Sequence, residues 1–245
     1  MNKAPIAAVR EERPHNKSKN DSGRNANTSL DKTAIRKTLL AQRSQAHKAE
    51  TRAQTEEIGV GTAEATKAAT EAAGAGLLGP MITWLQSRIA PGQILGTYSP
   101  IRTERDPEPV HAATLAPLAF PRVMGPDQPL CFFAVQGPND FELGSFGVRE
   151  PRATLPQVIP DVMLVPLVGF DRAGFRLGYG GGFYDRTLAK FQAIKPVLAV
   201  GFAYDGQLSH QPLNFEETDM ALDALMTPTR VYEFCNGTAR ETLWH

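Results

Sequence analysis

Apolar residues along the chain fall into short runs without polar alternation, and such runs predict buried strands. The clearest runs span residues 93–98, 118–123, 130–135, 162–170 and 197–203. Between them apolar residues recur at helical spacing, and we predict helices from Thr28 toward Glu50, at 81–89 and at 183–191. This alternation is typical of an α/β fold, a single domain with a mainly parallel sheet flanked by helices. We therefore expect a ligand crevice at the carboxyl ends of the strands.

The first predicted helix carries basic residues on one face. Thr28 and Asp31 stand at the separation of a capping box, which predicts that the helix begins there. Lys32 and Arg36 are four residues apart and therefore share a face, with Arg43 two turns further along. A solvated basic surface is the ordinary alternative for such residues.

Four glycines stand between the predicted strand that ends at residue 170 and the predicted helix at 183–191, in the segment Arg176-Leu-Gly-Tyr-Gly-Gly-Gly-Phe-Tyr-Asp-Arg186. Glycine lets a backbone approach a ligand closely, and the free N–H groups at a helix start favour anions. No Gly-Lys-Ser/Thr ends the segment, and Phe183 stands where a dinucleotide-binding motif has its last glycine. We predict a polyphosphate-binding loop in which Mg²⁺ bridges Asp185 and phosphate oxygens. The alternative is a structural turn, with Asp185 complementing the helix start.

Several segments together resemble the 5-formyltetrahydrofolate cyclo-ligases, also called methenyltetrahydrofolate synthetases. The longest is Pro166-Leu-Val-Gly-Phe-Asp-Arg-Ala-Gly-Phe-Arg-Leu-Gly-Tyr-Gly-Gly-Gly-Phe-Tyr-Asp-Arg186, and residues 32–36, 98–106, 147–151 and 219–227 accompany it in the family's order and spacing. The resemblance covers roughly residues 30–230. The chain departs from it at two places: Glu104-Arg-Asp-Pro107 replaces a frequent Glu-Val-Asp-Thr, and Phe183 replaces a frequent tyrosine.

The resemblance implies one site for Mg·ATP and 5-formyltetrahydrofolate, with roles for individual residues. It assigns the aspartates that match Asp185 and Asp219 to Mg²⁺, with Asp185 the stronger candidate. The residues implied in catalysis are Lys32, Arg36, Arg176 and Tyr184. The implied ATP contacts are Lys32, Arg36, Arg176, Leu177, Gly178, Tyr179, Gly180, Gly181, Gly182, Phe183 and Tyr184, and the implied folate contacts are Ser99, Glu104, Tyr179, Gly180, Gly181, Gly182 and Phe183.

From the residues alone, ordinary alternatives stay open at several of these positions. Glu104 fits a surface loop among charged neighbours equally well, and Asp219 fits a polar turn. Tyr179, Phe183 and Tyr184 fit packing of the loop against the sheet.

Composition sets the remaining expectations. A chain of 245 residues with 42% hydrophobic residues and a formal net charge of zero fits one sizeable domain, and nothing in it requires nucleic acid or a membrane. We expect a cytoplasmic monomer in which Cys131 and Cys235 are free thiols. We expect a disordered N-terminal tail at 1–28, the α/β domain at 29–235 with an Ala/Gly/Thr-rich insertion near 59–79, and a C-terminal tail at 236–245.

The implied reaction is ATP-dependent closure of 5-formyltetrahydrofolate to 5,10-methenyltetrahydrofolate, with release of ADP and phosphate. The protein would position the substrates and neutralise charge, because both nucleophiles belong to the folate. Two alternatives stay open: a non-catalytic relative that binds nucleotide or folate, and an ATP-dependent enzyme of the same fold that acts on another amide or carboxylate.

Overall fold

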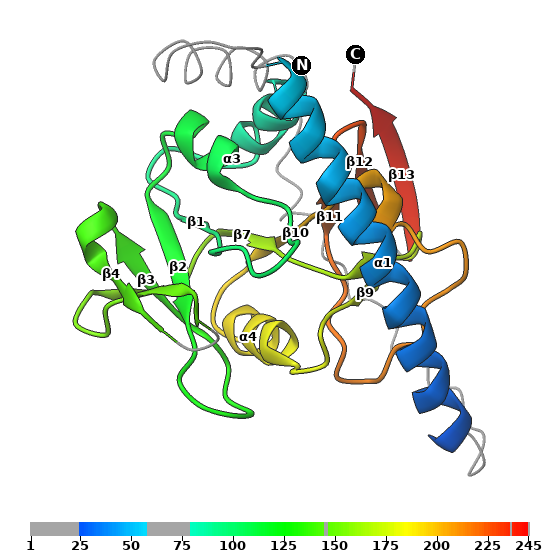
Figure 1. The fold of residues 1–245 in the computed structure, drawn as a ribbon. Coiled ribbons are helices and arrows are strands. Elements are labelled where there is room, and N and C mark those ends of the chain that lie inside the picture. Colours follow the sequence, from blue (N-terminus) through cyan, green and yellow to red (C-terminus); the bar gives the residue numbers. More distant parts are fainter. Residues whose placement is uncertain (1–24, 58–78, 145–146, 236, 245) are drawn as a thin grey trace.

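The structure is a computed structural model, and it describes residues 25–57, 79–144, 147–235 and 237–244 (Figure 1). The expected N-terminal tail falls outside these ranges up to residue 24, and so does the expected insertion near 59–79, apart from its last residue. No helix in the described ranges is long and apolar enough to cross a membrane.

The first helix, α1 (Asn25–Glu57), extends beyond the predicted range at both ends. No proline or glycine interrupts these residues, so nothing in the sequence stops the backbone hydrogen bonding. Because α1 already includes Thr28 and Asp31, the predicted capping box at its start is wrong. Besides α1, the described ranges contain a helix over residues 79–86, α3 (Glu108–Ala113), α4 (Phe183–Gln192), and short 3₁₀ helices at Pro138–Asp140 and Asp205–Gln207.

Within the described residues, nine strands form one mixed sheet in the order β13-β12-β11-β10-β7-β1-β2-β3-β6. The strands from β11 through β10, β7 and β1 to β2 pair in parallel, and antiparallel strands flank them on both sides. The predicted α/β class with a largely parallel sheet is confirmed. The strand bounds are β1 (Leu95–Gly96), β2 (Leu118–Arg122), β3 (Cys131–Val135), β6 (Gln157–Val158), β7 (Val162–Val165), β10 (Leu198–Phe202), β11 (Ala224–Met226), β12 (Arg230–Cys235) and β13 (Thr238–Leu243).

Helices cover both faces of the central strands, as fully apolar strands require. Along β7, Met163 and Val165 belong to a core cluster that also contains Leu188 and Phe191 of α4. Val162 and Leu164 point to the opposite face, where a second cluster contains Met81 and Leu85 of the helix over 79–86 and Val110 of α3. Helix α1 runs diagonally across the molecule beside β9 (Figure 1).

The predicted strand at 162–170 is divided in two. Strand β7 ends at Val165 and is followed by Pro166, which has no backbone N–H to continue a ladder. Strand β8 (Gly169–Phe170) then pairs with β9 (Arg176–Leu177) in a separate antiparallel ribbon. Strands β4 (Phe141–Leu143) and β5 (Arg149–Pro151) form another small ribbon.

The end of the chain also differs from the expectation of a C-terminal tail at 236–245. Residues Thr238–Leu243 form β13, which pairs antiparallel with β12 along six residue pairs from Arg230↔Leu243 to Cys235↔Thr238. Four of the six residues in Thr-Ala-Arg-Glu-Thr-Leu are polar, so no apolar run marks this strand, and both of its faces are largely exposed.

Candidate functional site

The glycine-rich loop connects a strand to a helix, as predicted. The strand is β9 of the small ribbon rather than a strand of the main sheet, which corrects the expectation that the 162–170 run leads directly into it. Gly180 has φ +98° and Gly182, the residue before α4, has φ +61°. Both conformations are unfavourable for residues with a Cβ atom, so these two positions need glycine.

Helix α1 lies directly against this loop. Arg36 Nε donates a hydrogen bond of 2.9 Å to the carbonyl oxygen of Gly178. One turn further along, Leu39 packs so closely on β8 that a Cβ atom at Gly169 would lie 2.4 Å from Leu39 Cδ1. The structure therefore brings the predicted basic face of α1 to the predicted polyphosphate loop.

Lys32, one turn before Arg36 on α1, pairs with acidic residues from the segment before β11. Its Nζ is 2.8 Å from Glu216 Oε1 and 3.6 Å from Asp219 Oδ2. The backbone N–H of Glu216 donates to Asp219 Oδ2 at 2.8 Å, which closes this turn. Lys32 and Asp219, which are far apart in sequence, are thus brought together.

Arg176 and Asp185 form an ion pair across the base of the loop. Arg176 Nη2 lies 2.6 Å from Asp185 Oδ1, and the guanidinium also donates to the carbonyl oxygen of Met220. The N–H of Met220 donates to Asp185 Oδ1 at 3.0 Å, so Asp185 is tied to the residue that follows Asp219. Burial lowers the pKa of Arg176, and the carboxylates of Asp185 and Asp219 counter this by raising it.

The two aspartates fit a magnesium site only in part. Among the described residues, each directs one oxygen, Oδ1 of Asp185 and Oδ2 of Asp219, into protein contacts, and no hydrogen bond occupies its other oxygen. No group of three or more His, Cys, Asp or Glu side chains in the described ranges is arranged to hold a metal ion. Carboxylate pairs that need phosphate oxygens and water to complete an octahedron are typical of Mg²⁺ bound with a nucleotide.

Glu104 is buried after β1, with 6% of its surface exposed. Its Oε2 accepts the N–H of Ile101 at 2.9 Å, and burial raises its pKa to about 7. Burial, and after it the charge of Glu104, raises the pKa values of Tyr98 and Tyr184, so the Tyr184 phenol of α4 lies near this carboxylate. The surface-loop alternative for Glu104 is wrong.

Three other predicted residues have contacts that orient them without a ligand. Ser99 donates from Oγ to the carbonyl oxygen of Arg149 at 2.9 Å. Phe183 and Tyr184 are partly buried against the core cluster below α4, so the packing role is observed for both. Burial of Tyr184 raises the pKa of its phenol well above the usual range, which keeps the hydroxyl protonated.

Tyr179 brings in two arginines that the sequence analysis did not assign to the site. Arg43 and Arg102 lie over its ring, with guanidinium carbons 5.1 Å and 5.3 Å from the ring centroid. Arg43 also donates to the Tyr179 hydroxyl. The spacing of Arg43 from Arg36 on one helix face is a signal that could have found it, whereas Arg102 and Glu216 have no such signal.

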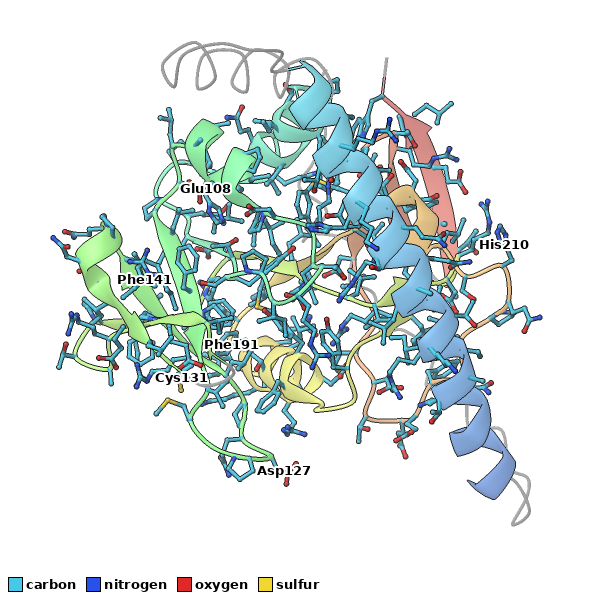
Figure 2. The ribbon with its side chains drawn as sticks, in the orientation of Figure 1. Glu108, Asp127, Cys131, Phe141, Phe191 and His210 are labelled. Carbon is cyan, nitrogen blue, oxygen red and sulfur yellow. The ribbon has the colours of Figure 1, made fainter. Side chains whose placement is uncertain are left out.

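Cys131 and His210 lie on opposite sides of the molecule, so this cysteine and this histidine form no nucleophile pair (Figure 2). Cys131 and Cys235 are free thiols. His111 is held between Thr97 and Glu108, at 2.7 Å and 3.1 Å, so both of its ring nitrogens have a partner.

Comparisons with known proteins agree on one family. A family model described as the 5-formyltetrahydrofolate cyclo-ligase family matches residues 112–228. A 5-formyltetrahydrofolate cyclo-ligase of Escherichia coli is 40% identical over 109 residues, which cover 43% of this chain and 59% of that relative. One of Mycolicibacterium smegmatis is 32% identical over 161 residues, covering 60% of this chain and 79% of the relative.

Solved structures extend the similarity to most of the fold. The 5,10-methenyltetrahydrofolate synthetase of Aquifex aeolicus has a TM-score of 0.57 and 28% identity, and the match covers 87% of this chain and 96% of that one. The 5,10-methenyltetrahydrofolate synthetase of Mycoplasma pneumoniae has a TM-score of 0.51 at 22% identity, and the match covers 80% of this chain and 96% of that one. At this identity the similarity supports the fold alone. In sequence, the match to the Escherichia coli relative extends over less than two thirds of its length, namely 59%.

Proposed function

The chain belongs to the 5-formyltetrahydrofolate cyclo-ligase family, and from that premise we propose that it closes 5-formyltetrahydrofolate to 5,10-methenyltetrahydrofolate with consumption of ATP. The observation that carries the proposal is the convergence of separate segments on the glycine-rich loop. Arg36 of α1 contacts Gly178, while Lys32 and Asp185 are both tied to the segment around Asp219 and Met220.

In the proposed reaction the oxygen of the N5-formyl group attacks the γ-phosphate of ATP, and ADP leaves. N10 of the same folate then attacks the activated carbon, and loss of phosphate leaves the methenyl ring. Both nucleophiles belong to the substrate, so the protein contributes orientation and charge neutralisation.

Residues of the loop and of α1 have defined roles in this proposal. Lys32 and Arg36 hold phosphate oxygens, Lys32 as a point charge and Arg36 as a planar fork. The loop backbone at 178–182 and Arg176 support the same group from the other side. Asp185 and Asp219 would hold Mg²⁺, which supplies charge neutralisation to the phosphates when it is bound.

The folate is proposed to bind at the buried carboxylate. A carboxyl group such as that of Glu104 can pair with the N–H donors of a pterin ring, and Tyr179 and Phe183 offer flat surfaces beside the glycine backbone. Ser99 lies three residues past the end of β1, in the same connection as Glu104. The crevice expected at the carboxyl ends of the strands is part of this proposal.

The test is to mix the purified protein with 5-formyltetrahydrofolate, Mg²⁺ and ATP and to follow the absorbance of the methenyl product together with ADP. We expect equal amounts of both products, and Lys32→Ala and Asp185→Asn to lower kcat/KM by at least about tenfold, because each removes a charge-assisted contact. Lys37→Ala and Asp127→Asn are matched controls, because both side chains are exposed and lie outside the proposed contacts.

Absence of both products from a folded wild-type protein would overturn the proposed activity. Binding of ATP or folate without turnover would then support the alternative of a binding module, and ADP formation with another amide or carboxylate would support the same-fold enzyme.

A further inference from the structure

Positive charges around the glycine-rich loop fall into two groups. Lys32 is paired with Glu216 and Asp219, and Arg176 is paired with Asp185. Arg36, Arg43 and Arg102 have no carboxylate within 4.0 Å among the described residues. The charges of Arg43 and Arg102 act on the buried Glu104 carboxyl, but neither arginine forms an ion pair with it. The side of the loop around Gly178 and Tyr179 therefore has three guanidinium groups and one carboxyl group, which leaves an excess of positive charge.

Arg43 cannot bind an anion from solution directly, because only 1% of its surface is exposed. Its guanidinium is satisfied by neutral acceptors: the carbonyl oxygen of Leu167 at 3.1 Å, Thr103 Oγ1 at 3.2 Å and the Tyr179 hydroxyl. A buried cation without a counter-ion is costly unless such hydrogen bonds are made. These bonds join α1, the end of β7 and the loop before Glu104 to the ring of Tyr179.

Arg102, unlike the buried Arg43, is open to solvent. Its side chain is exposed, and its backbone has φ +56°, a left-handed conformation that is unfavourable for a residue with a Cβ atom. The turn that holds it is closed by the bond from Glu104 N–H to the carbonyl oxygen of Ile101, at 3.1 Å. Strained backbone of this kind concentrates at functional sites, and here it carries a guanidinium over Tyr179.

We propose that Arg102 is an anion-binding residue of this site, which takes a phosphate or carboxylate oxygen of a substrate, and that Arg43 is a positioning residue that fixes Tyr179 beneath it. A planar guanidinium suits both kinds of oxygen. In the setting of the proposed function, on which the identity of the anion rests, the sources are the triphosphate of ATP and the glutamate carboxylates of the folate.

Calorimetric binding without turnover tests the proposal. The probes are tripolyphosphate, ATP, 5-formyltetrahydrofolate and 5-formyltetrahydropteroate, which lacks the glutamate. For Arg102→Gln we expect the Kd of at least one anionic probe to rise about tenfold, the usual effect of losing one charge-assisted hydrogen bond. Arg152→Gln is the matched control, because Arg152 is an exposed arginine whose contacts are with Asn139 and Glu142.

The pattern of losses identifies the source of the anion. Weaker binding of tripolyphosphate and ATP alone supports the phosphate, and weaker binding of 5-formyltetrahydrofolate but not of 5-formyltetrahydropteroate supports the glutamate carboxylate. If every Kd for Arg102→Gln stays within twofold of that for Arg152→Gln, or if the wild type binds none of the anionic probes, the anion site is wrong. Tripolyphosphate binding that depends on Arg102 in a protein without turnover would uphold the site while the proposed activity fails.

A double-mutant cycle separates positioning by Arg43 from a general structural role. If Arg43 acts through Tyr179, the effect of Arg102→Gln on Kd shrinks to less than threefold in an Arg43→Met background, whereas additive effects would contradict the positioning role. Tyr179→Phe keeps the ring and removes the acceptor of Arg43, so it provides the same cycle if Arg43→Met does not fold.

Discussion

Glu104 is a carboxyl group whose environment opposes ionisation. Its one hydrogen bond to the Ile101 N–H and the charges of Arg43 and Arg102 favour the carboxylate, but burial outweighs them and raises its pKa to about 7. Near neutral pH the group is therefore divided between its neutral and ionised forms. For a group proposed to face a pterin, this means that binding and protonation are coupled.

The raised pKa of Glu104 predicts that the stability of the folded protein depends on pH. The pKa of Glu104 rises from 4.5 in the unfolded chain to about 7 in the folded one, so the folded protein binds the proton more tightly and loses stability as the pH rises between these values. We expect the free energy of unfolding of Glu104→Gln, measured relative to that of wild type, to increase by up to about 3 kcal/mol as the pH rises from 5 to 8. Urea unfolding of both proteins across this range measures the difference.

Glu216→Gln is the control for Glu104→Gln. Lys32 lowers the pKa of the exposed Glu216 below its ordinary 4.5, so the contribution of this carboxylate to stability is complete above pH 5 and is lost only at lower pH. The difference in stability between Glu216→Gln and wild type should therefore stay constant between pH 5 and pH 8. Parallel curves for wild type and Glu104→Gln at every pH would mean that burial does not perturb Glu104.

The glycine-rich loop combines two kinds of glycine. Gly180 has φ +98°, whereas Gly178 has an ordinary φ and open space where a Cβ atom would lie. We expect Gly180→Ala to lower the free energy of unfolding by about 1–2 kcal/mol, because alanine is strained at positive φ. Gly178→Ala, the matched control, should leave it unchanged or raise it by up to about 1 kcal/mol through the unfolded state. Equal stabilities of the two variants in urea would contradict this backbone geometry.

The elements also show how far the sequence predicts the structure. The runs at 118–123, 130–135 and 197–203 become β2, β3 and β10 nearly as predicted, because each is apolar on both faces. The short strands β4, β5, β6 and β9 have two or three residues each, too few for a periodic pattern. They depend on partners that only the folded chain supplies.

The same limit applies to the candidate site. Lys32, Arg36 and the glycine-rich loop come together as the motifs predict, but Glu216 is 184 residues from Lys32 and no local pattern marks it. Arg105, in the segment that departs from the family, has the sequence context of an ordinary loop arginine. It is only 4% exposed, and its guanidinium lies 4.4 Å from the ring centroid of Phe202 and 3.4 Å from Glu50. The substitution thus anchors the residue after Glu104 through tertiary contacts.

The main sheet is completed by β13, a strand whose polar sequence predicts a tail. Strand β13 covers the edge of β12, and an open edge is a template for pairing with other chains. Trp244, directly after it, packs against the second core cluster and donates from Nε1 to the carbonyl oxygen of Thr227 at 2.9 Å. The end of the chain thus contributes to the core as well as to the sheet.

Removal of β13 should therefore cost far more than loss of a tail. We expect a chain that ends at Cys235 to lose at least about 2 kcal/mol in free energy of unfolding, because it loses a six-residue antiparallel pairing and the buried part of Trp244. It should also self-associate through β12 in sedimentation experiments. Thr242→Ser, an exposed change on β13, is the control and should stay within about 0.5 kcal/mol of wild type. If the truncated chain matches wild type in urea midpoint and remains monodisperse, residues 238–244 behave as the expected tail and β13 contributes nothing to the fold.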